Sequence, residues 1–276
     1  MRFFCLRIPH FAAWAQAQIN PALSPEAFAI CENNHVVAPS PQASAAGIKA
    51  GMSLSKATAK LSALQVVPRN KSLEAVAWQE VQYQLYGLTP KIEANRPGLL
   101  YCDVEPAKVS NLLRLWDGGA QWVGAGCASD RATAHIAALL APPGTTRVIP
   151  PGKDWEQIGK IPLKLLVGEI RPETISDLDF FGWNTLSSLR PLTRRQLEEQ
   201  FDGKAYGQDG AKLFRFAQGT QCPENLRPIP DWRQPEQITV RLAFEFPAME
   251  PGEWEPGLLD ALALACAQLG TRSAQS

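Results

Sequence analysis

The 276-residue sequence lacks several features that would identify common classes of protein. It has no charge excess, since 27 basic residues balance 27 acidic ones, which argues against a protein that coats nucleic acid. Its six cysteines include no CxxC pair, so a structural zinc site is not expected. No apolar run approaches the roughly 18–20 residues of a membrane-spanning helix. Strand-like residues begin at position 2 with no secretory signal before them, and we expect a cytoplasmic protein.

The first 150 residues alternate between strand and helix signals. Apolar periodicity predicts strands over residues 2–8, 27–37 (a hairpin), 91–105 (two strands broken at 96–98), 121–125 and 148–150. It predicts helices over residues 11–18, 40–64 (two short helices, with Ser53 capping the second), 71–88, 107–117 and 130–140. Strands interleaved with helices indicate an α+β sheet lobe.

The chain after Pro162 has a different character. Helices are predicted over residues 163–167, 172–179, 185–189, 193–200 and 209–218. Residues 219–237 hold five prolines and few periodic apolar residues, which is typical of a linker. A strand over 238–246 and a helix over 257–269 follow. One strand and one helix do not form a stable domain, so this last piece packs on the main body or the natural protein continues.

The order of these segments, with several short motifs, resembles the Y-family (UmuC/DinB-like) of translesion DNA polymerases. Gly47-Ile48-Lys49-Ala50-Gly51-Met52 is similar to the family's G-[VI]-[KR]-x-G-M, and Leu178 to Leu189 is similar to its helix-hairpin-helix. The resemblance implies a palm with inserted fingers over residues 1–162 (fingers about 11–72) and a helical thumb over 163–219. A linker over 220–237 and an incomplete, little-finger-like α/β domain over 238–276 would follow.

Within that family the match is closest to ImuB-like proteins, because the opening Cys5-Leu6-Arg7-Ile8-Pro9 is similar to their C-L-x-I-P pattern. ImuB-like proteins are viewed as non-catalytic adaptors in DNA repair, translesion synthesis and SOS mutagenesis. The resemblance therefore implies four partners: DNA, the sliding clamp, a replicative-type polymerase and a RecA-like protein. No clamp-binding peptide is found in this chain. The nearest candidate, Gln196 to Phe201, has Glu199 at the apolar anchor and lies in a predicted helix.

The residues that active members use for catalysis are missing from the matching positions. The metal-binding carboxylates fall on Arg7, Gly98 and Leu99, and the contacts to the incoming triphosphate fall on Pro41 and Ser44. The aromatic steric gate falls on Ala12. A cation at Arg7 would repel a divalent metal by roughly 4 kcal/mol for each unit charge at about 4 Å and an effective dielectric of 20. We therefore expect a protein without polymerase activity and without a bound cofactor or metal.

Two other functional interpretations stay open. Asp103 and Glu105 share a strand face and could be a displaced metal pair, which would make the chain an active polymerase, although a lone strand-end Asp is more often a turn or cap residue. The incomplete last domain also fits a truncated, decayed homologue. The histidines, His135 among them, are too scattered in sequence to indicate a catalytic triad.

The sequence offers one candidate DNA contact. Gly182, Asn184 and Thr185 form the turn of the predicted hairpin, where backbone N–H groups could bind phosphate, and Arg194 and Arg195 begin the next helix. The alternatives are a plain helix–helix turn and a solvated helix face.

Overall fold

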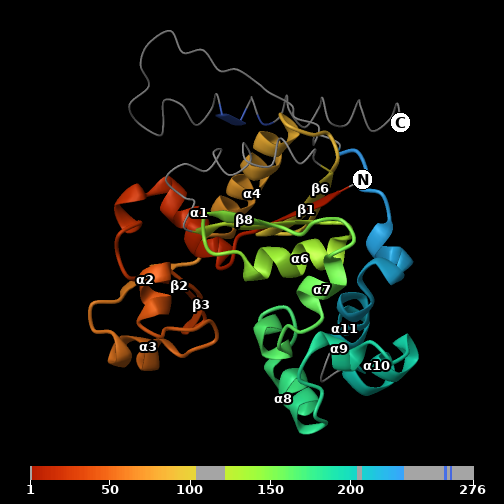
Figure 1. The fold of residues 1–276 in the computed structure, drawn as a ribbon. Helices are drawn as coiled ribbons and strands as arrows, with labels where there is room; N and C mark the ends of the chain where they lie inside the picture. The colour runs from red at the N-terminus through yellow and green to blue at the C-terminus, as the bar shows by residue number, and fades with distance from the viewer. Residues whose placement is uncertain (1, 104–121, 204–206, 233–257, 260–261, 263–276) are drawn as a thin grey trace. The chain divides into compact units, whose positions relative to one another are not determined.

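The computed structural model describes residues 2–103, 122–203, 207–232, 258–259 and 262 (Figure 1). The chain divides into two compact units, Met1–Trp232 and Arg233–Ser276. The first unit carries almost all of the described residues, and its architecture follows. The predicted helix at 107–117, the strand at 238–246 and Glu105 lie outside the described residues. No described helix combines the length and apolar character needed to span a membrane.

A five-stranded sheet forms the centre of the first unit (Figure 1). Its strands are β1 (Phe3–Arg7), β5 (Ile92–Arg96), β6 (Leu99–Asp103), β7 (Gly124–Ala128) and β8 (Thr145–Val148), in the order β5-β6-β1-β7-β8. Strand β1 is antiparallel to both of its neighbours, whereas β7 and β8 are parallel. Helix α6 (Arg131–Leu140) connects that parallel pair, as a crossover of this kind requires. The mixed α+β class predicted from the sequence is confirmed.

The last two strands of this sheet begin about three residues away from their predicted positions. Strand β7 was expected at 121–125 and β8 at 148–150. The sequence of β7, Gly-Ala-Gly-Cys-Ala, shows no apolar alternation because α6 lies too close for large side chains. A Cβ on Gly126 would lie 2.1 Å from the backbone oxygen of Ala134 in α6.

The two faces of the sheet pack against different helices. Phe4, Leu6, Leu100 and Cys102 face α1 (Phe11–Ile19) and α4 (Lys71–Tyr86). Phe3, Cys5, Leu99 and Tyr101 face α6 and the helical segment that follows it. Residues 99–102 therefore alternate between the two faces of the sheet. Since Arg7 continues the Phe3–Cys5 side of β1, its side chain belongs to the α6 face.

A smaller, three-stranded sheet lies in the region predicted as fingers. It contains β2 (Phe28–Glu32), β3 (His35–Pro39) and β4 (Gln65–Pro68) in the order β3-β2-β4, and the 3-10 turn η1 (Pro21–Leu23) precedes it. Helices α2 (Pro41–Ala45) and α3 (Leu54–Lys60) lie between β3 and β4. The predicted hairpin is confirmed, with Asn33 and Asn34 at positive φ in its turn. Strand β4 was not predicted because four residues ending in proline give little periodic signal.

The segment after β8 is mainly helical. Its helices after Pro162 were predicted, whereas the helix over Asp154–Ile158 was not. It contains α7 (Asp154–Ile158), η4 (Leu163–Leu166), α8 (Pro172–Phe180), α9 (Leu186–Leu189), α10 (Arg194–Phe201), the short ribbon β9 (Asp202–Gly203) and β10 (Gly207–Gln208), and α11 (Asp209–Gln218). Leu178, Leu186, Leu197, Phe201 and Leu213 are buried in one apolar cluster with the α6 face of the sheet. The helical segment therefore shares its core with the strand that carries Arg7.

Part of the region predicted as a linker, 220–237, belongs to the first unit, which extends to Trp232. Two 3-10 turns, η5 (Gly219–Gln221) and η6 (Pro223–Leu226), lead to Trp232. The Trp232 backbone N–H donates to the Pro90 oxygen at 2.7 Å, and its indole N–H donates to Gln82 Oε1 at 3.1 Å. Its ring lies 5.4 Å from that of Tyr83, and Asp231 forms an isolated β-bridge with Lys91.

Candidate functional site at the end of strand β1

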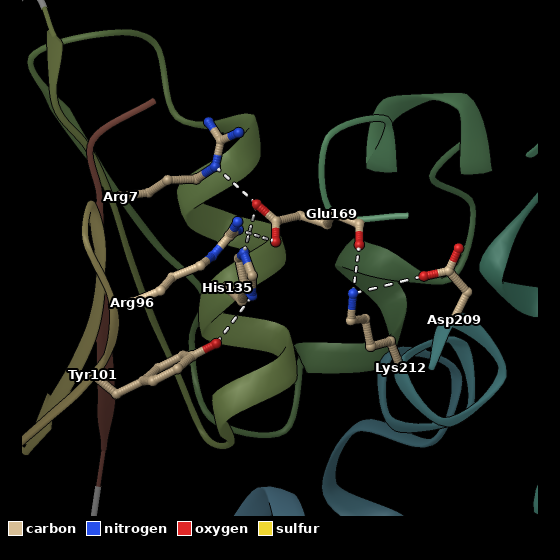
Figure 2. Close-up of polar contacts among 7 residues, drawn as sticks. All are labelled: Arg7, Arg96, Tyr101, His135, Glu169, Asp209 and Lys212. Atoms are coloured by element: carbon tan, nitrogen blue, oxygen red, sulfur yellow. Dashed lines mark hydrogen bonds and ion pairs between the residues drawn. The ribbon is translucent and has the colours of Figure 1, made fainter. Parts of the chain in front are cut away.

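Two arginines from different strands converge on one buried carboxylate (Figure 2). Arg7 is the last residue of β1 and Arg96 the last of β5, while Glu169 lies in the turn between η4 and α8. Arg7 Nε is 3.4 Å from Glu169 Oε1, and Arg96 donates to Glu169 Oε2. The Glu169 side chain is only 8% exposed. A segment more than seventy residues further along the chain therefore supplies the counter-charge for both strand ends.

His135 joins this cluster from α6, which packs beside these strands (Figure 2). Its Nε2 lies 3.5 Å from Glu169 Oε1, and its Nδ1 lies 3.0 Å from the hydroxyl of Tyr101 in β6. A neutral imidazole with its proton on Nε2 accepts from Tyr101 and presents an N–H to Glu169. Arg7, Arg96, Tyr101, His135 and Glu169 are hereafter called the Glu169 cluster.

The charges of the Glu169 cluster are fixed by its burial and its arginines. Burial opposes ionisation of Glu169, yet His135, Arg96 and Arg7 together lower the pKa of Glu169 to about 2. Burial lowers the pKa of His135, the two arginines act in the same direction, and only Glu169 opposes this shift. At neutral pH the cluster therefore holds an ionised Glu169, a neutral His135 and two guanidinium groups.

Helix α11 holds the turn that carries Glu169 (Figure 2). Lys212 donates to the Glu169 backbone oxygen at 3.2 Å and lies 3.6 Å from Asp209 Oδ1. The buried Asp209 in turn accepts the Arg171 backbone N–H at 3.0 Å and the Thr174 hydroxyl at 2.8 Å through Oδ2. Contacts on both sides of Glu169 therefore fix the position of its carboxylate.

The other two positions matched to metal ligands cannot carry a carboxylate without local change. Gly98 has φ +81°, and a Cβ there would lie 2.5 Å from the Ile8 backbone oxygen. The side chain of Leu99 is buried in the core on the α6 face. Leu99 pairs directly with Arg7 in the β1–β6 register. The three matched positions do lie together, but they present a cation, a glycine and a core leucine.

The residues at this site do not fit a divalent metal ion. Magnesium in polymerase sites is held by carboxylates, and the carboxylate of the Glu169 cluster is already paired with two guanidinium groups. Over the described part of the chain, no group of three or more His, Cys, Asp or Glu side chains could hold a metal. Asp103, the alternative ligand, lies 3.7 Å from Lys91 Nζ.

The positions matched to nucleotide contacts also carry groups of a different kind. Pro41 and Ser44 both lie in α2, whose N-terminus is capped by the Ser40 hydroxyl. Ala12, at the steric-gate position, is buried against the α1 face of the sheet. None of these three side chains carries a positive charge for a triphosphate.

The candidate DNA contacts lie on the helical segment. Gly182 has φ +76° in the turn between α8 and α9, and Thr185 is the N-cap of α9 in a capping box with Ser188. The Gly182 N–H donates to the Asp179 oxygen at 2.9 Å, and the Thr185 N–H donates to Ser188 Oγ at 3.4 Å. These two N–H groups are thus engaged within the chain.

The two arginines of α10 are also paired within the chain. Arg194 forms ion pairs with Glu198, at 2.6 Å, and with Glu224. Arg195 Nε lies 2.7 Å from Glu199 Oε1, and both side chains are mostly exposed. Phosphate contact at Gly182, Asn184, Thr185, Arg194 and Arg195 stays a prediction.

Sequence reasoning identified Arg7 but missed its partners. Arg96, Tyr101, His135 and Glu169 come from two strands, a helix and a turn, and no local spacing relates them. His135 is buried because Tyr101, Phe216 and Glu169 surround its ring.

Comparisons with known proteins agree on the fold. Residues 6–138, a little under half of the chain, match the model of the impB/mucB/samB family. A comparison with curated proteins finds no sequence match. Among solved structures, DinB from Sulfolobus solfataricus is similar over 84% of this chain and 70% of its own, with a TM-score of 0.65 and 19% identity.

A second solved structure, a ternary complex of Dbh, covers 97% of this chain and 80% of its own, with a TM-score of 0.65 and 20% identity. A DinB family error-prone DNA polymerase from Sulfolobus solfataricus gives a TM-score of 0.64 at 22% identity over 84% of this chain and 69% of its own. These comparisons confirm the predicted resemblance to the Y-family polymerase superfamily and its fold.

Proposed function

We propose that this chain, which has the fold of a Y-family DNA polymerase, is a non-catalytic adaptor in DNA repair, translesion synthesis and damage-induced mutagenesis. The observation that carries the proposal is the reversed charge at the end of β1. Arg7 stands at the position matched to a metal-binding aspartate, and Arg96 lies beside it on the same carboxylate. A site built to hold two divalent cations needs the opposite charge.

A small movement of the side chains around Arg7 would not create a metal site. Releasing Glu169 to bind a metal would leave two guanidinium groups without their buried partner. Each would then repel the metal by several kcal/mol at close range. A carboxylate side chain at position 98 would collide with the Ile8 backbone oxygen. The side chain at position 99 is buried in the core.

The finer identity and the partners follow from the sequence resemblance. We propose an ImuB-like member, on the basis of residues Cys5 to Pro9 and the replaced carboxylates. Such a protein would bring together DNA, the sliding clamp, a replicative-type polymerase and a RecA-like partner. Weak DNA contact through Arg194 and Arg195 at the start of α10 is part of this proposal, as is a cytoplasmic location.

Primer extension tests the proposal directly. The full chain is incubated with a labelled primer–template and nucleotides, with magnesium and then with manganese, beside an active Y-family polymerase. The expected result is no extension, and a shifted primer in the same gel would indicate a DNA-bound adaptor. Extension that is lost in Asp103→Asn and kept in Glu156→Gln, an exposed control, would contradict the proposal and support displaced ligands. If the gel shows no extension and no shifted primer, the result favours a protein-binding or decayed homologue.

A further inference from the structure

Two phenylalanines are exposed where helix α8 ends. The side chain of Phe180 is 86% exposed and that of Phe181 is 46% exposed. Their rings lie 5.7 Å apart, and the ring of Phe181 lies 5.3 Å from that of Trp183. Trp183 is backed by Phe201 of α10 at 6.5 Å. A row of aromatic rings thus runs from the core of the helical segment to solvent.

The row leads into a groove of about 530 Å³. Its lining includes Pro162, Lys164, Pro172, Ile175, Asp179 and Trp183, and it is hereafter called the α8 groove. Two prolines, an isoleucine and a tryptophan give it rigid apolar walls that need little ordering on binding. Rigid aromatic side chains at a concave site are the groups that dominate binding energy in protein–protein interfaces.

The charge on the α8 side of this groove is negative. Helix α8 carries Glu173, Asp177 and Asp179 and no basic residue, and its C-terminal end lies at Phe180. The negative end of the helix dipole adds to the charge of the exposed Asp179 in the last turn, which lines the groove. This charge repels phosphate and attracts a Lys or Arg side chain, which could also stack on the exposed Phe180 ring.

The backbone donors at the end of α8 are already used. The N–H groups of Phe181, Gly182 and Trp183 donate to the oxygens of Asp177, Asp179 and Leu178, at 2.9 to 3.0 Å. A phosphate would therefore meet carboxylates rather than free N–H groups. These contacts favour a protein ligand over nucleic acid at this turn.

We propose that the α8 groove, together with Phe180 and Phe181, binds an apolar segment of a partner protein that carries arginine or lysine. The apolar side chains of that segment fill the groove between Pro172, Ile175 and Trp183, and its cation lies against Asp179 and the end of α8. This inference rests on the proposed adaptor function, since it names the chemistry by which an adaptor would recognise a partner.

The test selects ligands without assuming their sequence. Phage-displayed random short peptides are enriched on the full chain, with the double variant Phe180→Ser/Phe181→Ser as the counter-selection. An enriched peptide is then labelled, and its affinity is measured by fluorescence anisotropy against the native chain, the double variant and Asp179→Lys. Val76→Ser and Glu156→Lys change equally exposed residues elsewhere and are the matched controls. Thermal unfolding verifies that each variant is folded.

The expected result is enrichment of peptides that combine apolar residues with Arg or Lys and lack acidic ones. Both groove variants should weaken binding by about tenfold or more, as loss of an interface hot spot does, while both controls leave it unchanged. No enrichment, enrichment of acidic peptides, or binding that Asp179→Lys leaves intact would overturn the inference. Loss of primer–template binding in the groove variants, without peptide binding, would overturn it in favour of DNA contact.

The outcomes of this test and of primer extension are independent. If the chain binds peptides and also extends primers, the adaptor proposal is refuted and the proposed peptide binding at the α8 groove stands. If the chain is inactive and selects no peptide, the proposed peptide binding is refuted and the adaptor proposal stands.

Discussion

Replacing Glu169 with glutamine should destabilise the first unit at neutral pH by at most about 3 kcal/mol. The estimate uses the pKa of Glu169, which is about 2 in the folded chain against 4.5 for an unperturbed glutamate. Each pKa unit corresponds to about 1.4 kcal/mol of preferential stabilisation of the ionised form. Since the side chain is 8% exposed, solvent screening reduces this value only slightly. Because His135 is neutral at this pH, the effect there should come mainly through Arg96 and then Arg7.

The predicted difference between native chain and variant depends on pH in a defined direction. The folded pKa lies below the unfolded one, so the stabilisation by Glu169 is complete above about pH 4.5. It decreases as the pH falls toward 2, where the carboxyl is protonated in both states. The native chain and Glu169→Gln should therefore differ most near pH 7 and converge in acid.

Urea unfolding followed by tryptophan fluorescence measures this difference. Glu199→Gln is the matched control, because Glu199 also pairs with an arginine but is 62% exposed. Its cost should stay within about 0.5 kcal/mol, as for other surface ion pairs. A cost for Glu169→Gln no larger than that of the control, or one that does not decrease in acid, would refute the reasoning.

Three further predictions concern other parts of the first unit. Gly98→Ala should cost about 2 kcal/mol or more in urea unfolding, because φ is +81° and the new Cβ would meet the Ile8 oxygen at 2.5 Å; a neutral effect would show that the turn relaxes. Trp232→Ala should cost roughly 2–3 kcal/mol and speed proteolysis after residue 219, since the ring and its hydrogen bond to Gln82 are lost; unchanged cleavage would contradict this. Burial lowers the pKa of His135, so protonation below about pH 6.5 favours unfolding, and His135→Gln should flatten the unfolding free energy against pH there; an unchanged slope would contradict this.

The sequence predicted the elements that carry periodic apolar residues. The helices after Pro162 and the hairpin at Asn33 and Asn34 lie within a residue or two of their expected positions. Strands β7 and β4 were misplaced or missed, because one is made of small residues under α6 and the other is four residues long. Local propensity carries no information on how closely a helix approaches a strand.

The sequence predicted the residues at the positions of the metal ligands but not the residues that surround Arg7. Matching Arg7, Gly98 and Leu99 to metal-ligand positions followed from the resemblance to the Y-family polymerases. The counter-charge from Glu169 required the three-dimensional path of a segment more than 160 residues after Arg7. For the same reason the pairing of Arg194 with Glu224 could not be read from the local helix pattern, which indicates only the pairs within α10.

The contacts of Trp232 with Gln82 and Pro90 have a consequence for the folding of the chain during its synthesis. Among the described strands, β5 lies at one edge of the sheet, and the bridge between Lys91 and Asp231 covers the chain just before it. About 140 residues must leave the ribosome after Lys91 before that cover can form. During this interval the nascent sheet exposes unpaired backbone groups at its edge. Newly synthesised chains interrupted before Trp232 should therefore be the ones that depend most on chaperones.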